Sequence, residues 1–285
     1  MSEDKPFDRR LRRLRRDRAA ARFGDANYLY RLAADELIER LTMVKRHFAQ
    51  ALDLGCADGY LAGRLRELGI KVSCADPGGY FAEHAKGVQC DEDRLSFADS
   101  SFDLIVSVGT LDGVNDLPGA LTLIRRALRP DSLFLGAFAG AGSLPRLRSA
   151  MTAADAVMGA AAPHIHPQID VRAAGDLLTR AGFALPVADS VQVDVRFSGL
   201  RKLVQDLRYM GATNILSSRS RLALSRRGLA AAMADFESAA DADGKTGEQF
   251  QIIYLTGWSP GPDQPKPARR GSASASLAAA LSSKA

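Results

Sequence analysis

Hydrophobic residues follow two different periods along this chain. Between residues 28 and 49 they return every three or four positions, which predicts an amphipathic helix. From residue 50 onward, short apolar runs alternate with stretches of helical period. The runs that predict strands are 51–54, 71–75, 87–90, 102–108, 132–138, 187–197 and 250–258. The further predicted helices are 60–68, 81–86, 116–128, 144–161, 171–181 and 199–242, the last with a break near 211–214.

This alternation of strands and helices predicts the fold class. The run at 102–108, FDLIVSV, is apolar on both faces, as expected for a parallel strand that helices cover on both sides. Strands that alternate with helices form βαβ units with right-handed crossovers. We therefore predict an α/β fold with a mostly parallel, seven-stranded sheet, helices on both faces and a helical insertion at 199–247 before the last strand.

Composition excludes several classes of protein. Of the 285 residues, 46% are hydrophobic and 25% are charged, which is ordinary for a globular chain and excludes a collagen-like or wholly disordered one. No apolar run approaches the roughly 18 residues of a membrane span, and the first residues lack the pattern of a secretory signal. The three cysteines form no CxxC pair, which argues against a zinc ribbon. We expect no metal site and a reducing compartment, the cytoplasm.

The net charge of +5 is concentrated at the N-terminus. Residues 1–22 hold nine Lys or Arg and four Asp or Glu, whereas residues 23–285 hold equal numbers of basic and acidic residues. A solvated basic helix that caps the folded body is favoured over an arm that binds nucleic acid or an anionic membrane, because the body shows no basic face with interleaved aromatics. We divide the chain into a basic arm (1–27), one domain (28–258) and a flexible Pro/Ser/Ala-rich tail (259–285).

The strongest chemical signal is the segment LDLGCADG at 52–59, where a predicted strand runs through a glycine-rich turn into a helix. Such a turn lets a ligand approach the backbone and the free N–H groups of the helix. A dinucleotide site requires GxGxxG, but Ala57 and Tyr60 replace two of its glycines. The pattern Asp-x-Gly-x-(Gly/Ala)-x-Gly fits instead, with an acid that can face a cationic ligand. The candidate cofactor-binding residues here are Asp53, Gly55, Cys56, Ala57 and Gly59, and Cys56 is interpreted as a packed residue rather than a nucleophile.

Further candidates lie at the ends of the next three strands. Asp76, followed by Pro77, ends the second strand, where a carboxylate can accept both ribose hydroxyls of a nucleoside. An Asp that only begins a turn with Pro77-Gly78-Gly79 is the alternative. Asp91, followed by Glu92, comes just after the third strand and can accept a hydrogen bond from an adenine amino group, although a solvated loop acid is an open alternative. Ser107 lies near the end of the fourth strand.

Together these residues resemble the class I S-adenosylmethionine (SAM) methyltransferases over residues 50–140. Phe102–Ser107 and Leu128–Asp131 look like the fourth-strand and fifth-strand segments of that family. The resemblance implies a Rossmann-like class I SAM methyltransferase fold with SAM as the cofactor. It also implies that Asp53 lies near the ammonium group of the ligand, with Asp76 on the ribose and Asp91 on the adenine.

A narrower resemblance covers nearly the whole chain. The segments 7–9, 16–20, 114–119, 177–183, 206–208, 210–214 and 250–258 are similar to methyltransferase-like assembly factors of NADH dehydrogenase (complex I), and more distantly to the carrier-protein methyltransferase of biotin synthesis. The resemblance implies a protein substrate, with a complex I subunit as a partner near the inner face of a membrane. It also implies that the activity need not be methyl transfer, because a family member is credited with hydroxylating an arginine of a complex I subunit.

Two segments on the expected substrate side depart from the family pattern. Asp112-Gly113 stand where the family has an aromatic residue or His, and 142–148 lacks the acids that the family often has there. Nearby, His164 and His166 form an HxH pair that we interpret as part of a polar loop beside the cleft, with a general base as the alternative. We identify no catalytic residue from the sequence.

The sequence therefore favours a SAM-dependent methyltransferase that acts on a protein. The alternatives are a SAM-fold arginine hydroxylase and a non-catalytic assembly factor that binds a complex I subunit. A nucleic-acid methyltransferase is disfavoured, because residues 108–111 do not form the Asn/Asp-Pro-Pro-aromatic segment used on flipped bases. The oligomeric state is not predicted.

Overall fold

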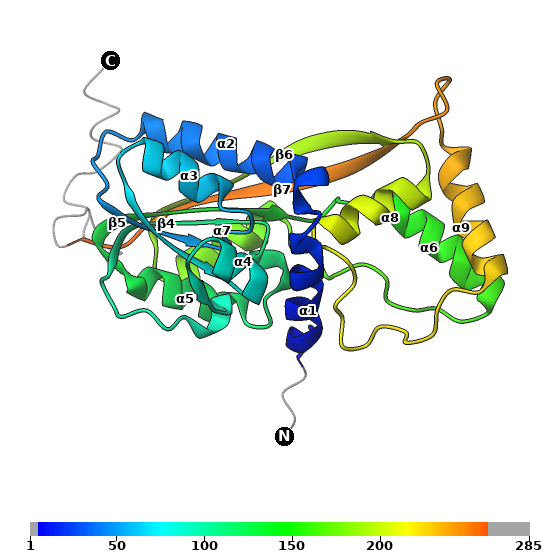
Figure 1. The fold of residues 1–285 in the computed structure, drawn as a ribbon, viewed down its shortest axis with the longest axis horizontal. Helices are drawn as coiled ribbons and strands as arrows, with labels where there is room; N and C mark the ends of the chain where they lie inside the picture. Colours follow the sequence, from blue (N-terminus) through cyan, green and yellow to red (C-terminus); the bar gives the residue numbers. More distant parts are fainter. Residues whose placement is uncertain (1–4, 262–285) are drawn as a thin grey trace, which may run out of the picture.

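The computed structural model describes residues 5–261, whose central sheet and flanking helices are shown in Figure 1. Within these residues the sheet has seven strands in the order β3-β2-β1-β4-β5-β7-β6. The strands are β1 (Gln50–Leu54), β2 (Lys71–Asp76), β3 (Val88–Gln89), β4 (Phe102–Val108), β5 (Leu128–Ala139), β6 (Ala184–Phe197) and β7 (Thr246–Trp258). Neighbours from β3 to β5 are parallel, and β7 is antiparallel to both β5 and β6. The predicted α/β fold with a mostly parallel sheet is confirmed.

Helices cover both faces of this sheet. The helices of the described residues are α1 (Arg9–Ala20), α2 (Tyr28–Met43), α3 (Tyr60–Glu67), α4 (Gly79–His84), α5 (Leu117–Ala127), α6 (Pro145–Met158), α7 (Val171–Arg180), α8 (Leu200–Tyr209) and α9 (Arg226–Ser238). Of these, α2 and α3 pack on one face of the sheet, and α5 and α7 pack on the other. Side chains of β4 alternate between the two layers: Leu104 and Val106 belong to the core under α2, and Ile105 to the core over α5 and α7. Because successive side chains enter two different cores, FDLIVSV carries apolar residues on both faces.

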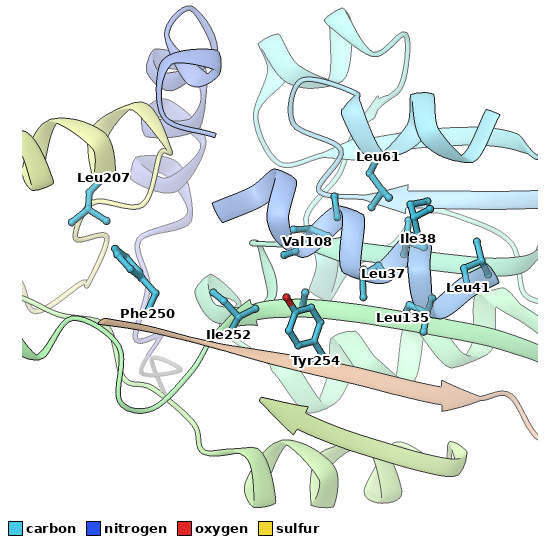
Figure 2. Close-up of a cluster of buried hydrophobic side chains, with 14 of the residues drawn as sticks. Leu37, Ile38, Leu41, Leu61, Val108, Leu135, Leu207, Phe250, Ile252 and Tyr254 are labelled. Carbon is cyan, nitrogen blue, oxygen red and sulfur yellow. The ribbon is translucent and has the colours of Figure 1, made fainter. Parts of the chain in front are cut away.

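The core under α2 continues from the sheet into a helical lobe formed by α6, α8 and α9. Figure 2 shows Leu37 and Leu41 of α2 turned toward Leu135 of β5. Further along the same cluster, Phe250 of β7 and Leu207 of α8 lie where the core continues into the lobe. Figure 1 shows α1 standing between the sheet and this lobe, so the first helix contacts both parts.

Three predicted boundaries are corrected. The predicted helix 28–49 ends at Met43, because Val44 is already extended. The predicted helical stretch 199–242 is two helices separated by residues 210–225, since Gly211 with a φ of +72° follows the end of α8. The insertion ends where β7 begins, at Thr246, because β7 pairs with β6 along nearly its whole length.

The C-terminal boundary also moves. Ser259 is buried and donates its N–H to Ser132 O at 2.7 Å, so ordered pairing extends past Trp258. The rest of the predicted flexible tail, from residue 262, lies outside the described residues. Among the helices between residues 5 and 261, none combines the length and the apolar character needed to span a bilayer.

Candidate functional site

The glycine-rich turn lies between β1 and α3, at the carboxyl edge of the sheet. Gly55 has a φ of +90°, and a Cβ atom there would lie 2.4 Å from Thr110 Cγ2, so the position excludes any side chain. Gly59 has a φ of +78°, but a Cβ atom added there would meet no atom within 4 Å. Glycine is therefore favoured at this position only by the left-handed backbone conformation. The N–H groups of Gly55 and Cys56 donate to Ala75 O at 2.7 and 3.1 Å, which ties the turn to β2.

Asp53 places a carboxylate beneath this turn. Its side chain is fully buried, and neither oxygen has a hydrogen-bond donor among residues 5–261. Burial raises the pKa of Asp53 well above its ordinary value, with Cys74 and Asp76 adding to the effect and the backbone of Ala62 and the charge of Arg66 opposing it. A buried carboxyl without a donor is costly, so the position suits a ligand that brings a donor or a positive charge.

Asp76, at the end of β2, is also fully buried but has a complete set of donors. Its Oδ1 accepts from Gly78 N at 2.7 Å and from Arg16 Nε at 2.8 Å. Its Oδ2 accepts from Ala57 N at 3.0 Å and from the second guanidinium nitrogen of Arg16 at 2.6 Å. Burial alone would lower the pKa of Arg16, but the charge of Asp76 and these hydrogen bonds raise it above its ordinary value. The predicted ribose-binding carboxylate is therefore paired with the first helix.

The carboxylates after β3 are paired in the same way. Glu92 is fully buried, and both of its oxygens accept from the Arg12 guanidinium, at 2.6 and 2.9 Å. Asp91 Oδ2 accepts from Arg13 at 2.5 Å and lies 3.3 Å from Arg9 Nη1. With an exposed fraction of 2%, Asp91 is not the solvated loop acid that the sequence left open.

Helix α1 delivers these arginines because of its sequence period. Its N-cap Asp8 accepts from Leu11 N at 2.9 Å, which fixes the start of the helix. Arg9, Arg12, Arg13 and Arg16 then recur at three- and four-residue steps, so they share one helical face. The prediction that a basic helix caps the body is confirmed, but the prediction that it is solvated is wrong for Arg12 and Arg16, which are buried. The periodic spacing was the signal that could have revealed their role.

The remaining predicted residues lie close to this edge. Cys56 is fully buried and packs with Ala62 and Cys74, in agreement with its interpretation as a packed residue. Ser107 Oγ lies 3.2 Å from Thr110 Oγ1, under the turn. Pro77 O accepts from the Gln89 side chain at 3.0 Å, which joins the loop after β2 to β3. All ten predicted cofactor-binding residues thus lie at or just beyond the carboxyl ends of β1 to β4, as parallel strands require.

A cavity of about 320 Å³ opens beside the turn, between the sheet and the helical lobe. Ala57 and Gly109 line it on the sheet side, and Arg16 lines it where it approaches Asp76. Most of the wall is apolar, including Phe23, Leu29, Val108, Phe138, Leu147, Met151, Leu207 and Phe250. Ser143, Leu144 and Leu147 also line the cavity. Segment 142–148, which departs from the family pattern, therefore borders it.

Asp112, His164 and His166 are titratable side chains among these apolar walls, which also include Arg16 and Tyr30. Burial raises the pKa of Asp112 to about 6, although the charge of Arg12 partly opposes it. His164 Nε2 lies 2.9 Å from Asp155 Oδ1, which orients the imidazole at the cavity wall. His166 Nε2 accepts from Ile215 N at 3.1 Å, and burial, with Arg15 and Arg12 nearby, lowers its pKa to about 4. The HxH pair is therefore beside the cleft, as predicted, with its two rings in different hydrogen bonds.

No metal centre is evident here. Within the part of the chain that the structure describes, no three His, Cys, Asp or Glu side chains gather in a way that could hold an ion.

These residues fit a SAM ligand on one side of the site only. The donor-free carboxylate of Asp53 and the open backbone at Gly59 can receive the amino-acid part. On the other side, where the nucleoside of SAM would bind, the carboxylates of Asp76, Asp91 and Glu92 form ion pairs with arginines of α1. A nucleoside cannot use these carboxylates while α1 keeps its present position.

Comparison with known proteins points to one group. A family described as "Methyltransferase domain" matches residues 52–136. The chain is 35% identical to the mitochondrial arginine-hydroxylase NDUFAF5 of Danio rerio, over 95% of this chain and 88% of that protein. For the Homo sapiens protein of the same name the identity is 36%, over 95% and 82%. A malonyl-[acyl-carrier protein] O-methyltransferase of Laribacter hongkongensis is 31% identical, over 86% and 87%.

Solved structures share the fold at low sequence identity. A Bacillus halodurans protein superposes with a TM-score of 0.55 at 12% identity, covering 79% of this chain and 98% of that one. The YcgJ protein of Bacillus subtilis gives a TM-score of 0.54 at 15% identity, covering 81% and 99%.

Proposed function

Because the chain belongs to the family of class I methyltransferase-like proteins that includes the NDUFAF5 arginine hydroxylases, we propose that it is a SAM-dependent methyltransferase acting on a protein substrate. The observation that carries this proposal is the donor-free carboxylate of Asp53 beneath the glycine-rich turn. It lies within the segment that matches the methyltransferase domain. Burying an acid without a hydrogen-bond donor costs free energy, and a cationic ligand at the turn would compensate for that cost.

We assign the cofactor contacts to residues at the carboxyl edge of the sheet. Asp53 would accept a hydrogen bond from the ligand's ammonium group, and the backbone of Gly55, Cys56, Ala57 and Gly59 would hold its amino-acid part. The carboxylates that can take the nucleoside are Asp76 and Asp91, once they are released from α1, with Pro77, Glu92 and Ser107 forming the surrounding wall.

The cofactor supplies a methyl group that is already activated as part of a sulfonium ion. The protein has to orient an acceptor and keep water away from it. The apolar walls of the cavity exclude water, and the cavity reaches the turn at Ala57 and Gly109. His164, oriented by Asp155, is one side chain at the wall that can take a proton from an acceptor.

The activities named for the relatives favour two chemistries on proteins. One relative is an O-methyltransferase that acts on malonyl-[acyl-carrier protein], which supports methyl transfer to a group carried by a protein. The higher-identity relatives are arginine hydroxylases, which makes hydroxylation of an arginine the second candidate. In either case we propose a complex I subunit as the partner, as the sequence resemblance implies, and a location in the cytoplasm near the inner face of a membrane.

Calorimetric titration with SAM and S-adenosylhomocysteine tests the cofactor assignment. Asp53→Asn keeps the shape of the side chain but removes its charge, so affinity should fall about tenfold or more, as for loss of a charge-assisted hydrogen bond. Asp103→Asn is the matched control, because Asp103 accepts from Ala49 N and Gln50 N at the opposite edge of the sheet. Equal affinities for the two folded variants would contradict the role of Asp53. If neither they nor the wild type bind, the third candidate, a non-catalytic assembly factor, is favoured.

A further inference from the structure

Helix α1 occupies the part of the site that a nucleoside would need. We propose that α1 is a displaceable cap, whose arginines and the nucleoside of the cofactor compete for the same carboxylates. This inference rests on the proposed function, since it concerns how the cofactor reaches its site. It goes further in assigning the chain two states, one with α1 docked and one with α1 released.

The argument begins with the hydrogen-bonding capacity of Asp76. A carboxylate offers about four lone-pair sites. In the docked state, two backbone N–H groups and two N–H groups of the Arg16 guanidinium use that capacity. The backbone donors belong to Ala57 and Gly78, which are fixed by the turn and the loop after β2. Ribose hydroxyls can therefore reach Asp76 only after Arg16 leaves.

The same competition holds at the other carboxylates. Arg12 binds both oxygens of Glu92, and Arg13 binds Asp91. Glu92 and Asp76 are fully buried, and the Arg12 and Arg16 side chains are each only 8% exposed. Exposed surface pairs form and break at little cost, but these pairs are shielded from solvent. The helix is thus held by its arginine face and not merely resting on the surface.

Arg16 also marks the boundary between the cavity and the nucleoside side. It lines the cavity beside Ala57, and its guanidinium lies 5.1 Å from the centre of the Phe81 ring. A ligand whose amino-acid end meets the turn would have to pass this guanidinium to reach Asp76. Helix α1 packs closely against the loop after β2 at this point, because a Cβ atom added at Gly78 would lie 3.0 Å from Arg16 Cβ.

Movement of α1 would change the acceptor side as well. Asp8 N donates to Ile215 O at 2.8 Å, and Ser217 N donates to Pro6 O at 2.8 Å, so the start of α1 is bound to the segment between α8 and α9. Arg15 donates to Asn214 O, and Asn214 lines the cavity. Release of α1 by the cofactor therefore reshapes the wall of the acceptor cavity, which couples the two ligand sites through one helix.

The test compares two double variants of the full-length protein in titrations with S-adenosylhomocysteine. Arg13→Gln/Arg16→Gln removes the guanidinium group of Arg13 from Asp91 and that of Arg16 from Asp76, and leaves Arg9 Nη1 3.3 Å from Asp91. Arg10→Gln/Arg18→Gln is the matched control, because both arginines are exposed on the same helix and form no ion pair within residues 5–261. The first variant should bind about tenfold tighter than the wild type and the control, because apparent affinity scales with the fraction of protein in the open state.

Hydrogen exchange of the wild type provides a readout that needs no variant. Saturating S-adenosylhomocysteine should speed exchange of the amides of residues 9–20 if α1 is released, and should slow it if α1 closes over the ligand. This measurement also decides the matter if Arg13→Gln/Arg16→Gln does not fold.

Each outcome separates the cap from the proposed function. Tighter binding by the first variant and faster exchange in α1 support the cap. Unchanged or weaker binding together with protection of α1 overturns the cap but leaves SAM binding intact, because the arginines would then belong to the occupied site. If no folded form binds, both proposals are overturned, since freeing the carboxylates creates no nucleoside site.

Discussion

Replacing Gly55 with alanine tests why the turn carries a glycine where it does. The new Cβ would lie 2.4 Å from Thr110 Cγ2 and 2.6 Å from its Oγ1, on a backbone with a φ of +90°. Strain from a left-handed backbone costs about 1–2 kcal/mol, and overpacking adds about 1–3 kcal/mol. Gly55→Ala should therefore lower the free energy of unfolding by about 2–5 kcal/mol. Gly59→Ala, with similar φ and no atom within 4 Å, should cost only the backbone part.

A double-mutant cycle separates the two contributions. Thr110→Ala removes the two atoms nearest to the new Cβ and leaves only Thr110 Cβ, at 3.0 Å, so Gly55→Ala/Thr110→Ala should recover about 1–3 kcal/mol relative to the sum of the single changes. Urea unfolding of the four variants and the wild type measures each free energy. If Gly55→Ala and Gly59→Ala are equally destabilising, or if the cycle shows no coupling, the steric reasoning about the turn is wrong.

Three further predictions concern the core and the buried titratable groups. Leu37→Ala should destabilise the protein by about 2–5 kcal/mol in urea unfolding, whereas Leu32→Ala, at an exposed position of α2, should change little; similar losses would refute the packing described for α2. Because the pKa of Asp112 is raised from 3.8 to about 6, its buried charge destabilises the fold above pH 6 by at most about 3 kcal/mol. Asp112→Asn should therefore stabilise the protein at pH 7.5 but not at pH 4, and an equal gain at both would contradict this. Because the pKa of His166 is lowered to about 4, the stability it contributes is present above pH 6.5 and is lost as the pH falls toward 4. His166→Gln should flatten that acid limb, and an unchanged limb would assign the loss to other groups.

Local pattern was sufficient to predict the sheet. FDLIVSV is apolar on both faces because β4 is covered by helices on both sides. This pattern can be recognised from the residues of the strand itself, without knowledge of the helices that pack on it. The start of β7 could not be predicted from its own residues, because Thr246 to Gln249 are held by pairing with β6 and not by apolar character. For the same reason the end of the insertion was misplaced by two residues.

The candidate site was predictable where its residues are close in sequence and not where they are far apart. Strand ends placed Asp53, Asp76 and Asp91 at one edge, since parallel strands share a direction. The pairing of Arg16 with Asp76 joins residues 60 positions apart, and no local period encodes such a contact. A count of charges described the arm as basic, but only the three- and four-residue spacing of its arginines indicated a face that could bind an acidic site.

The mass of the protein substrate after reaction decides whether this chain transfers a methyl group. Extract from cells that lack this protein would be incubated with the purified chain and SAM labelled in its methyl group, and complex I subunits would be analysed by mass spectrometry. Methyl transfer predicts one labelled methyl group on a subunit, absent with Asp53→Asn. A gain of one oxygen atom without label, or no modification by a chain that binds SAM, would contradict it.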